Sequence, residues 1–251
     1  MKLNFKKIGE GAPLIIVHGL FGSLDNWMTM ARQLSQKFTV YLIDQRNHGK
    51  STHSEDMNYE LMASDLFEFM KEHNIERSNF IGHSMGGKAI IQLALNHPEC
   101  IRKMMVIDIG IKKYPMHHQK ILAGLNGLDI KTLESRKQAE ERIALYIEEK
   151  AVQFFLLKGL FRNKDGSYGL KFNLNSLESN MENILTSVTG EISETDSLFV
   201  RGELSGYILE EDYANINEQF PYSKIVTIEG AGHWIHAEKP NELKEIILNY
   251  F

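Results

Sequence analysis

Gly82-His83-Ser84-Met85-Gly86-Gly87 places one serine among glycines, at the junction of two different segments. Residues 79–81 fit a short buried strand, and residues 87–96 have the apolar spacing of a helix. The pattern Gly-x-Ser-x-Gly in this context is typical of a serine nucleophile on a sharp strand-to-helix turn. Serine is also a good helix N-cap, so Ser84 could be only that. The strand before it and the helix after it favour the nucleophile.

Outward from this junction, short apolar runs alternate with helical patterns. Runs that are apolar at consecutive positions suit strands buried on both faces, and alternation with helices implies right-handed crossovers. The predicted fold class is therefore α/β, with a doubly wound, mostly parallel sheet and its site beyond the carboxyl ends of the strands. We expect strands near 3–8 and at 14–17, 38–43, 79–81, 103–107, 198–200 and 224–228, and helices at 58–73, 87–96, 210–220 and 241–250.

One long stretch, residues 113–195, breaks the alternation. It contains no convincing central strand; helical patterns cover 135–149, 150–161 and 176–188, and Asn163-Lys164-Asp165-Gly166 is a turn signal. Because strand patterns resume after it, we expect a helical cap at 113–195, inserted into a core formed by 1–112 and 196–251.

Composition narrows the class of protein. The 251 residues are 43% hydrophobic and 24% charged, which is ordinary for a globular chain, and the net charge is −5. No basic stripe predicts nucleic-acid binding, no apolar run predicts a membrane span, and the N-terminus lacks a secretory pattern. The chain has one cysteine and therefore no internal disulfide. We expect a cytoplasmic protein that is a monomer or a weak homo-oligomer and needs no cofactor.

Two further glycine-rich stretches supply candidate partners for Ser84. His18-Gly19-Leu20-Phe21-Gly22 follows an early strand, and Gly230-Ala231-Gly232-His233-Trp234 follows the last one. The backbone N–H of Met85 and that of Leu20 or Phe21 would hold the oxyanion of an acyl-transfer intermediate. His233 would serve as the base. His233 and His236 without a third ligand are a weak metal signal, so no metal is expected, and His83 should point away from the site.

The position of the triad acid departs from the common pattern. The carboxylate that usually follows the strand after the cap stands in a Gly-x-x-Asp context, but here the stretch is Gly202-Glu203-Leu204-Ser205. Serine cannot stabilise an imidazolium as a carboxylate does. Asp108 directly follows the strand at 103–107 and is the best replacement, with Glu203 as the alternative.

These blocks together resemble the α/β-hydrolase family, and within it the YbfF-type bacterial esterases. The matching stretches span nearly the whole chain: 17–26, 44–49, 80–88, 106–109 and 230–240. The resemblance implies hydrolysis of esters or thioesters of small to medium acyl chains, a cap over the site, and an acid after the earlier strand, which supports Asp108. We expect Phe21 and Trp234 to contact the substrate. Perhydrolysis, C–C bond hydrolysis, a lyase reaction or a non-catalytic receptor remain alternatives, because the fold alone does not choose among them.

Two signals near the N-terminal half carry no separate function. His48-Gly49-Lys50-Ser51 imitates the end of a phosphate-binding loop, but Asp44 stands where the first glycine is required. Arg46-Asn47-His48-Gly49 should brace the loops beneath the site.

Overall fold

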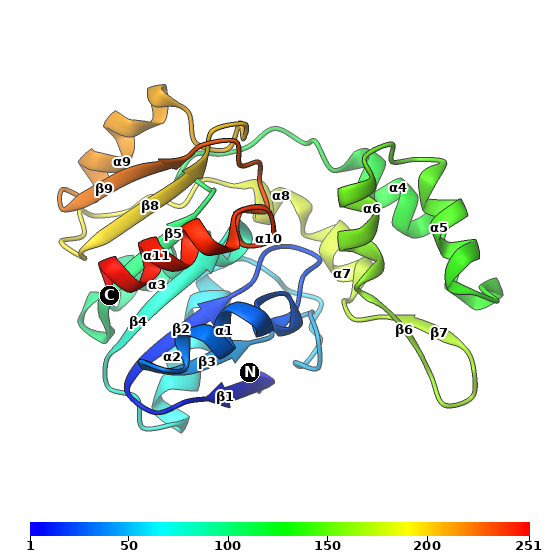
Figure 1. The fold of residues 1–251 in the computed structure, drawn as a ribbon, viewed down its shortest axis with the longest axis horizontal. Coiled ribbons are helices and arrows are strands. Elements are labelled where there is room, and N and C mark those ends of the chain that lie inside the picture. The colour runs from blue at the N-terminus through cyan, green and yellow to red at the C-terminus, as the bar shows by residue number, and fades with distance from the viewer.

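The computed structural model describes residues 1–251 and contains a seven-stranded sheet in the order β1-β3-β2-β4-β5-β8-β9 (Figure 1). Within this sheet only the pair β1–β3 is antiparallel, so the predicted doubly wound, mostly parallel α/β fold is confirmed. The strands are β1 (Phe5–Ile8), β2 (Ala12–Val17), β3 (Phe38–Ile43), β4 (Ser78–His83), β5 (Ile101–Ile107), β8 (Ser197–Gly202) and β9 (Ser223–Ile228).

Alternate residues of the central strands pack on opposite faces of the sheet. Leu14 and Ile16 of β2 join one apolar cluster and Ile15 and Val17 the other, and all four are at most 1% exposed. This burial on both faces explains the unbroken apolar runs of the sequence. One face is covered by α1 (Met28–Leu34), α10 (Ile235–Glu238) and α11 (Pro240–Tyr250), and the other by α2 (Tyr59–Glu72), α3 (Met85–Asn96) and α9 (Tyr213–Gln219) (Figure 1).

Local chemistry sets the bounds of these helices. The Asn58 side chain accepts a hydrogen bond from the Leu61 N–H at 2.9 Å and caps α2, which therefore begins one residue later than predicted. The predicted helix at 210–220 starts instead as a 3-10 turn, η4 (Glu210–Asp212), before α9. Two short helices of the core were not predicted: α1, after the 3-10 turn η1 (Leu24–Trp27), and α10. Both are too short to show a clear apolar period.

The segment between β5 and β8, residues 108–196, is called the inserted segment below. Figure 1 shows its helices α4, α5 and α6 set apart from the sheet, with a small hairpin beside them. Its elements are α4 (Gln119–Gly127), η3 (Ile130–Thr132), α5 (Arg136–Ala144), α6 (Lys150–Leu157), β6 (Leu160–Arg162), β7 (Tyr168–Leu170), α7 (Leu174–Ser179) and α8 (Met181–Leu185).

Several helix predictions in the inserted segment are wrong in detail. Helix α4 was missed, α5 is shorter than the predicted 135–149, and the predicted helix 176–188 is two short helices, α7 and α8. The predicted helix 150–161 ends at Leu157, because residues 160–162 pair with 168–170 in an antiparallel hairpin around the predicted turn at 163–166. The change from helix to strand after Leu157 could not be predicted, because the apolar stretch continues across it and a short apolar run fits either a helix or a strand. No helix of the structure is long and apolar enough to cross a membrane.

Candidate active site

Ser84 lies on the turn between β4, which ends at His83, and α3, which begins at Met85. Its backbone has φ 51° and ψ −120°, a strained conformation for a residue with a side chain. The turn also needs a close backbone approach: a Cβ on Gly86 would lie 2.5 Å from the Val17 carbonyl oxygen and 2.6 Å from that of His18. The glycines of the motif therefore let α3 begin against the end of β2.

The structure brings Ser84, His233 and Asp108 into one hydrogen-bonded chain. His233 Nε2 lies 3.1 Å from Ser84 Oγ, and His233 Nδ1 lies 2.7 Å from Asp108 Oδ2. An ionised carboxylate can only accept, so Nδ1 carries the imidazole proton and the lone pair of Nε2 faces the hydroxyl. His233 is thus oriented to take the Ser84 proton.

Asp108 is fully buried and accepts hydrogen bonds from three donors. These are His233, the Gly202 N–H at 3.0 Å to Oδ1, and the Ser205 hydroxyl, which donates to Oδ2. Ser205 occupies the position at which the Gly-x-x-Asp pattern would place the acid. Its hydroxyl donates a hydrogen bond to Asp108, the carboxylate that takes over that role. Glu203 instead accepts from the Gly230 N–H at 2.8 Å, away from His233.

Two backbone N–H groups beside Ser84 have no acceptor in the protein. Met85 is the first residue of α3 and therefore has no intrahelical acceptor, and the Leu20 N–H makes no hydrogen bond. The Phe21 N–H, by contrast, donates to His48 Nε2 at 3.2 Å. Of the two N–H groups considered in the early loop, only that of Leu20 is free to bind a ligand.

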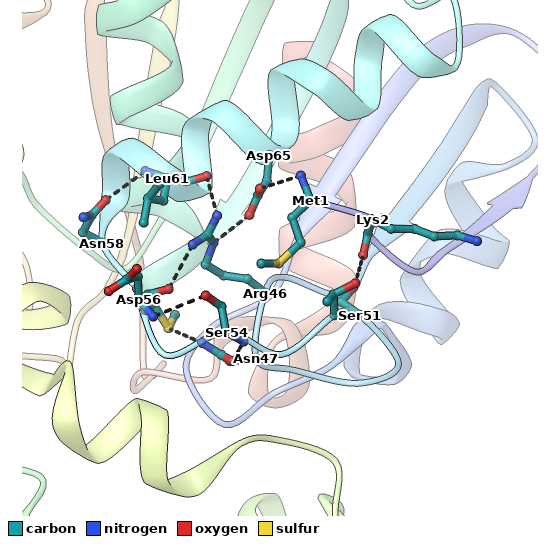
Figure 2. Close-up of polar contacts among 12 residues, drawn as sticks. Met1, Lys2, Arg46, Asn47, Ser51, Ser54, Asp56, Asn58, Leu61 and Asp65 are labelled. Carbon is teal, nitrogen blue, oxygen red and sulfur yellow. Dashed lines mark hydrogen bonds and ion pairs between the residues drawn. The ribbon is translucent and has the colours of Figure 1, made fainter.

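The loop at residues 46–49, which carries His48, is held in place by hydrogen bonds from several directions. His48 Nδ1 donates to the Arg46 carbonyl at 2.9 Å, which leaves Nε2 as the acceptor for Phe21. Figure 2 shows Arg46 reaching Asp65, with Nε 2.7 Å from Oδ2, while its other nitrogens donate to the carbonyls of Asp56 and Leu61. Residues 46–49 therefore hold the neighbouring loops in place by hydrogen bonds, as the sequence predicted.

A pocket of about 160 Å³ opens at Ser84, between the core and the inserted segment. Phe21 and Trp234, the two expected substrate contacts, both line it, and the Trp234 ring lies 5.4 Å from that of Phe155. The remaining wall is mostly apolar. From the core it includes Gly19, Leu20, His83, Tyr207 and His233, and from the inserted segment His117, His118, Ile121, Val152, Phe155 and Leu156.

Three side chains around His233 were missed or misjudged from the sequence. The prediction that His83 points away from the site is wrong: its Nε2 donates to the His233 carbonyl at 2.9 Å, and burial holds the His83 pKa well below its usual value. Tyr207 stacks on the His233 ring with centroids 4.1 Å apart. His118 lines the pocket, and burial lowers its pKa to about 4. Tyr207 and His118 stand in no motif, so no local signal could have found them, whereas His83 stands in the motif of Ser84 and its direction was misjudged.

An imidazole nitrogen facing a hydroxyl removes its proton only if the imidazolium that forms is stabilised, and the buried Asp108 carboxylate provides that charge. Because the hydroxyl stands on a strained turn after a parallel strand, the class of protein that this fold and site define is the serine hydrolases of the α/β-hydrolase type.

Comparison with known proteins identifies the family. The protein-family model described as "alpha/beta hydrolase fold" matches residues 12–137 of this chain, and the chain belongs to this family. Escherichia coli Esterase YbfF is 35% identical over 256 residues, which cover 100% of this chain and 99% of that protein. The Danio rerio sn-1-specific diacylglycerol lipase ABHD11 is 35% identical over 96% of this chain and 79% of its own length.

A solved structure gives the same result. The protein described as "Marine microorganism esterase" superposes with a TM-score of 0.97 at 45% identity, covering 100% of this chain and 99% of its own. The predicted likeness to YbfF-type esterases is confirmed, as is the predicted class, a serine ester hydrolase of the carboxylesterase type.

Proposed function

We propose that this protein hydrolyses esters of small carboxylic acids through an acyl-enzyme on Ser84, with His233 as the base and Asp108 as the acid of the triad. The observation that carries this proposal is the chain of two hydrogen bonds from Ser84 Oγ through His233 to the Asp108 carboxylate. Ester hydrolysis rather than another reaction of this fold is favoured by the relatives described as esterases and lipases.

The reaction begins when His233 Nε2 takes the proton of Ser84 as Oγ attacks the acyl carbon. The negative charge that develops on the former carbonyl oxygen is stabilised by the N–H groups of Met85 and Leu20, the two free donors beside Ser84. Losing one donor of such a pair costs about 2.7–4 kcal/mol of transition-state stabilisation.

The oxyanion then collapses, the bond to the leaving alcohol or thiol breaks, and His233 gives it the proton. A water molecule next loses its proton to His233 and attacks the acyl-enzyme, and Ser84 Oγ recovers the proton as the acid departs. Asp108 holds the His233 ring in place throughout, and two further donors, the Gly202 N–H and the Ser205 hydroxyl, fix its carboxylate.

We propose further that the inserted segment is a cap that limits the substrate. It contributes six residues to the pocket wall, and the pocket volume of about 160 Å³ lies below the 300–1,000 Å³ typical of sites for drug-sized ligands. We therefore infer short acyl groups, with Phe21 and Trp234 against the substrate.

Initial rates on p-nitrophenyl acetate, butyrate and octanoate test this function. The wild type should turn over acetate and butyrate faster than octanoate, and Ser84→Ala should lower kcat by on the order of 10⁶, the loss seen when a triad serine is removed. Equal rates for wild type and Ser84→Ala would contradict the role of Ser84. No turnover of any ester by the wild type would favour a non-hydrolytic reaction or a receptor.

A further inference from the structure

Lys88 is a buried cation that the proposed reaction does not use. It lies on α3, four residues after Ser84, and is 1% exposed. It has no carboxylate beside it, and burial lowers the pKa of Lys88 to about 7. Burying a charge without a counterion destabilises the folded state. We therefore ask what role other than stability the contacts of Lys88 serve.

All but one of those contacts involve the two ends of the inserted segment; the exception is Tyr59, on α2. The Lys88 ammonium donates to the carbonyl of Lys112 at 2.6 Å and to that of Thr186. It also lies 4.8 Å from the centre of the Tyr114 ring and 5.7 Å from that of Tyr59, within the range of cation–π attraction.

The two segments that Lys88 contacts form a neck, defined here as residues 111–114 and 185–188. They are joined to each other by two backbone hydrogen bonds of 2.8 Å, from the Tyr114 N–H to the Leu185 carbonyl and from the Val188 N–H to the Ile111 carbonyl. All chain connections between the core and α4–α8 pass through this neck. The neck carbonyls that point to Lys88 have no strand partner, so the ammonium is what satisfies them.

From this geometry we infer that Lys88 is a positioning residue, which fastens the neck of the inserted segment to the helix of the nucleophile and thereby sets how closely the cap covers the acyl pocket. The inference rests on the proposed function, since it assigns the lysine a part in choosing the acyl group. Lys88 acts through the neck and touches no reacting atom.

The test compares Lys88→Met with Lys103→Met. Methionine keeps most of the stem and removes the donors. Lys103, near the start of β5, is the control: its ammonium also donates to a carbonyl, that of Tyr250 at 2.9 Å, and lies 4.8 Å from a tyrosine ring. Unlike Lys88 it is partly exposed and pairs with Asp196 at 3.6 Å, and it has no contact with the neck. Two readouts are measured, the ratio of kcat/KM for p-nitrophenyl octanoate to acetate, and the rate of proteolytic cleavage within 113–195.

With Lys88→Met, we expect the octanoate-to-acetate ratio and the cleavage rate each to rise about tenfold, the effect of losing the net free energy of one or two hydrogen bonds. Lys103→Met should leave both at wild-type values even if its Tm falls. A lower Tm for Lys88→Met with both readouts unchanged would overturn the inference, because that is the signature of a merely structural lysine.

Misfolding of Lys88→Met and inactivity of the wild type can each be told apart from a failure of the inference. If Lys88→Met does not fold, Lys88→Gln takes its place: its amide is uncharged and, on a stem one atom shorter, cannot hold both neck carbonyls as Nζ does, so both readouts should still rise. Wild-type values of both readouts for Lys88→Gln would overturn the inference. Cleavage of the cap does not depend on ester turnover. Inactivity of the wild type would therefore count against the proposed function, whereas an unchanged cleavage rate counts against the role of Lys88.

Discussion

The acid of the proposed triad sits at the end of β5, one strand earlier than the Gly-x-x-Asp position. This exchange is possible because β5 and β8 are neighbours in the sheet, so their carboxyl ends lie side by side. Asp108, with φ 50°, reaches His233 from β5, while Ser205 and Gly202 at the end of β8 donate to its carboxylate. Hydrogen-bonding groups at and just after the end of β8 hold the acid in place.

Substitution of the two candidate acids separates their roles. Asp108→Asn should lower kcat by on the order of 10⁴, because an amide donates where the imidazole needs an acceptor and the wrong tautomer of His233 results. Glu203→Gln should leave kcat within a few-fold of wild type, since Glu203 contacts only the Gly230 N–H. Steady-state kinetics on p-nitrophenyl acetate decide the matter, and the reverse pattern would make Glu203 the acid.

The sequence predicted some residues of the site and not others for a definite reason. Ser84 and His233 stand in short motifs whose glycines are needed locally, so the motifs are visible in the chain. The Ser205–Asp108 contact joins residues 97 positions apart, and the stacking of Tyr207 on His233 depends on how the loop after β8 folds back. No local pattern encodes such contacts.

The junction of β4 and α3 is the element on which the site depends most. Gly86 lies in the first turn of α3, where alanine would ordinarily be the better helix former by about 1 kcal/mol. The carbonyl oxygens of Val17 and His18 exclude a methyl group there, and both belong to backbone that cannot rotate away. Packing against β2 therefore outweighs helix propensity at this position.

We expect Gly86→Ala to lower the free energy of unfolding by about 1–3 kcal/mol, the usual cost of overpacking. Gly206→Ala is the control, because a Cβ at Gly206 would meet no atom within 4 Å. The urea midpoint of each variant is the measurement. If Gly86→Ala were as stable as Gly206→Ala, the close approach of α3 to β2 would not be a constraint on the motif.

At the level of elements, prediction succeeded where burial is continuous and failed where it is not. The sheet strands were found because their apolar runs are unbroken, and α2 because its apolar period is long; α2 was placed within one residue at each end. The elements of the inserted segment are three to nine residues long, and their packing partners lie in other segments. Their bounds are set by those tertiary contacts rather than by local propensity.

On the scale of the whole molecule, the candidate site lies where the core meets the inserted segment. Several histidines in and beneath this region are buried, and burial disfavours the charged form of their rings. Five of the ten histidines are buried enough that burial lowers their pKa: to about 4 for His18 and His118, to about 3 for His48 and His236, and well below the usual value for His83. The folded protein holds all five as neutral rings at pH 7.

This burial predicts loss of stability in mild acid. An unfolded histidine has a pKa of about 6.5, so between that value and its folded pKa the unfolded chain binds more protons, and the free energy of unfolding falls as pH falls. Each such histidine contributes a slope of about 1.4 kcal/mol per pH unit in that interval. The contribution is absent above pH 6.5, where folded and unfolded rings are both neutral.

Urea unfolding at pH 7, 6 and 5 measures this slope, and His118→Phe isolates one part of it. The His118 ring makes no hydrogen bond, and its Nδ1 is buried without a partner, so phenylalanine leaves no other group unpaired. We expect the variant to equal or exceed the wild type in stability at pH 7 and to lose less free energy between pH 6 and 5, by about 1 kcal/mol. Equal losses for both proteins would mean that His118 is protonated in the folded state and that the pocket beside Ser84 admits water to that ring.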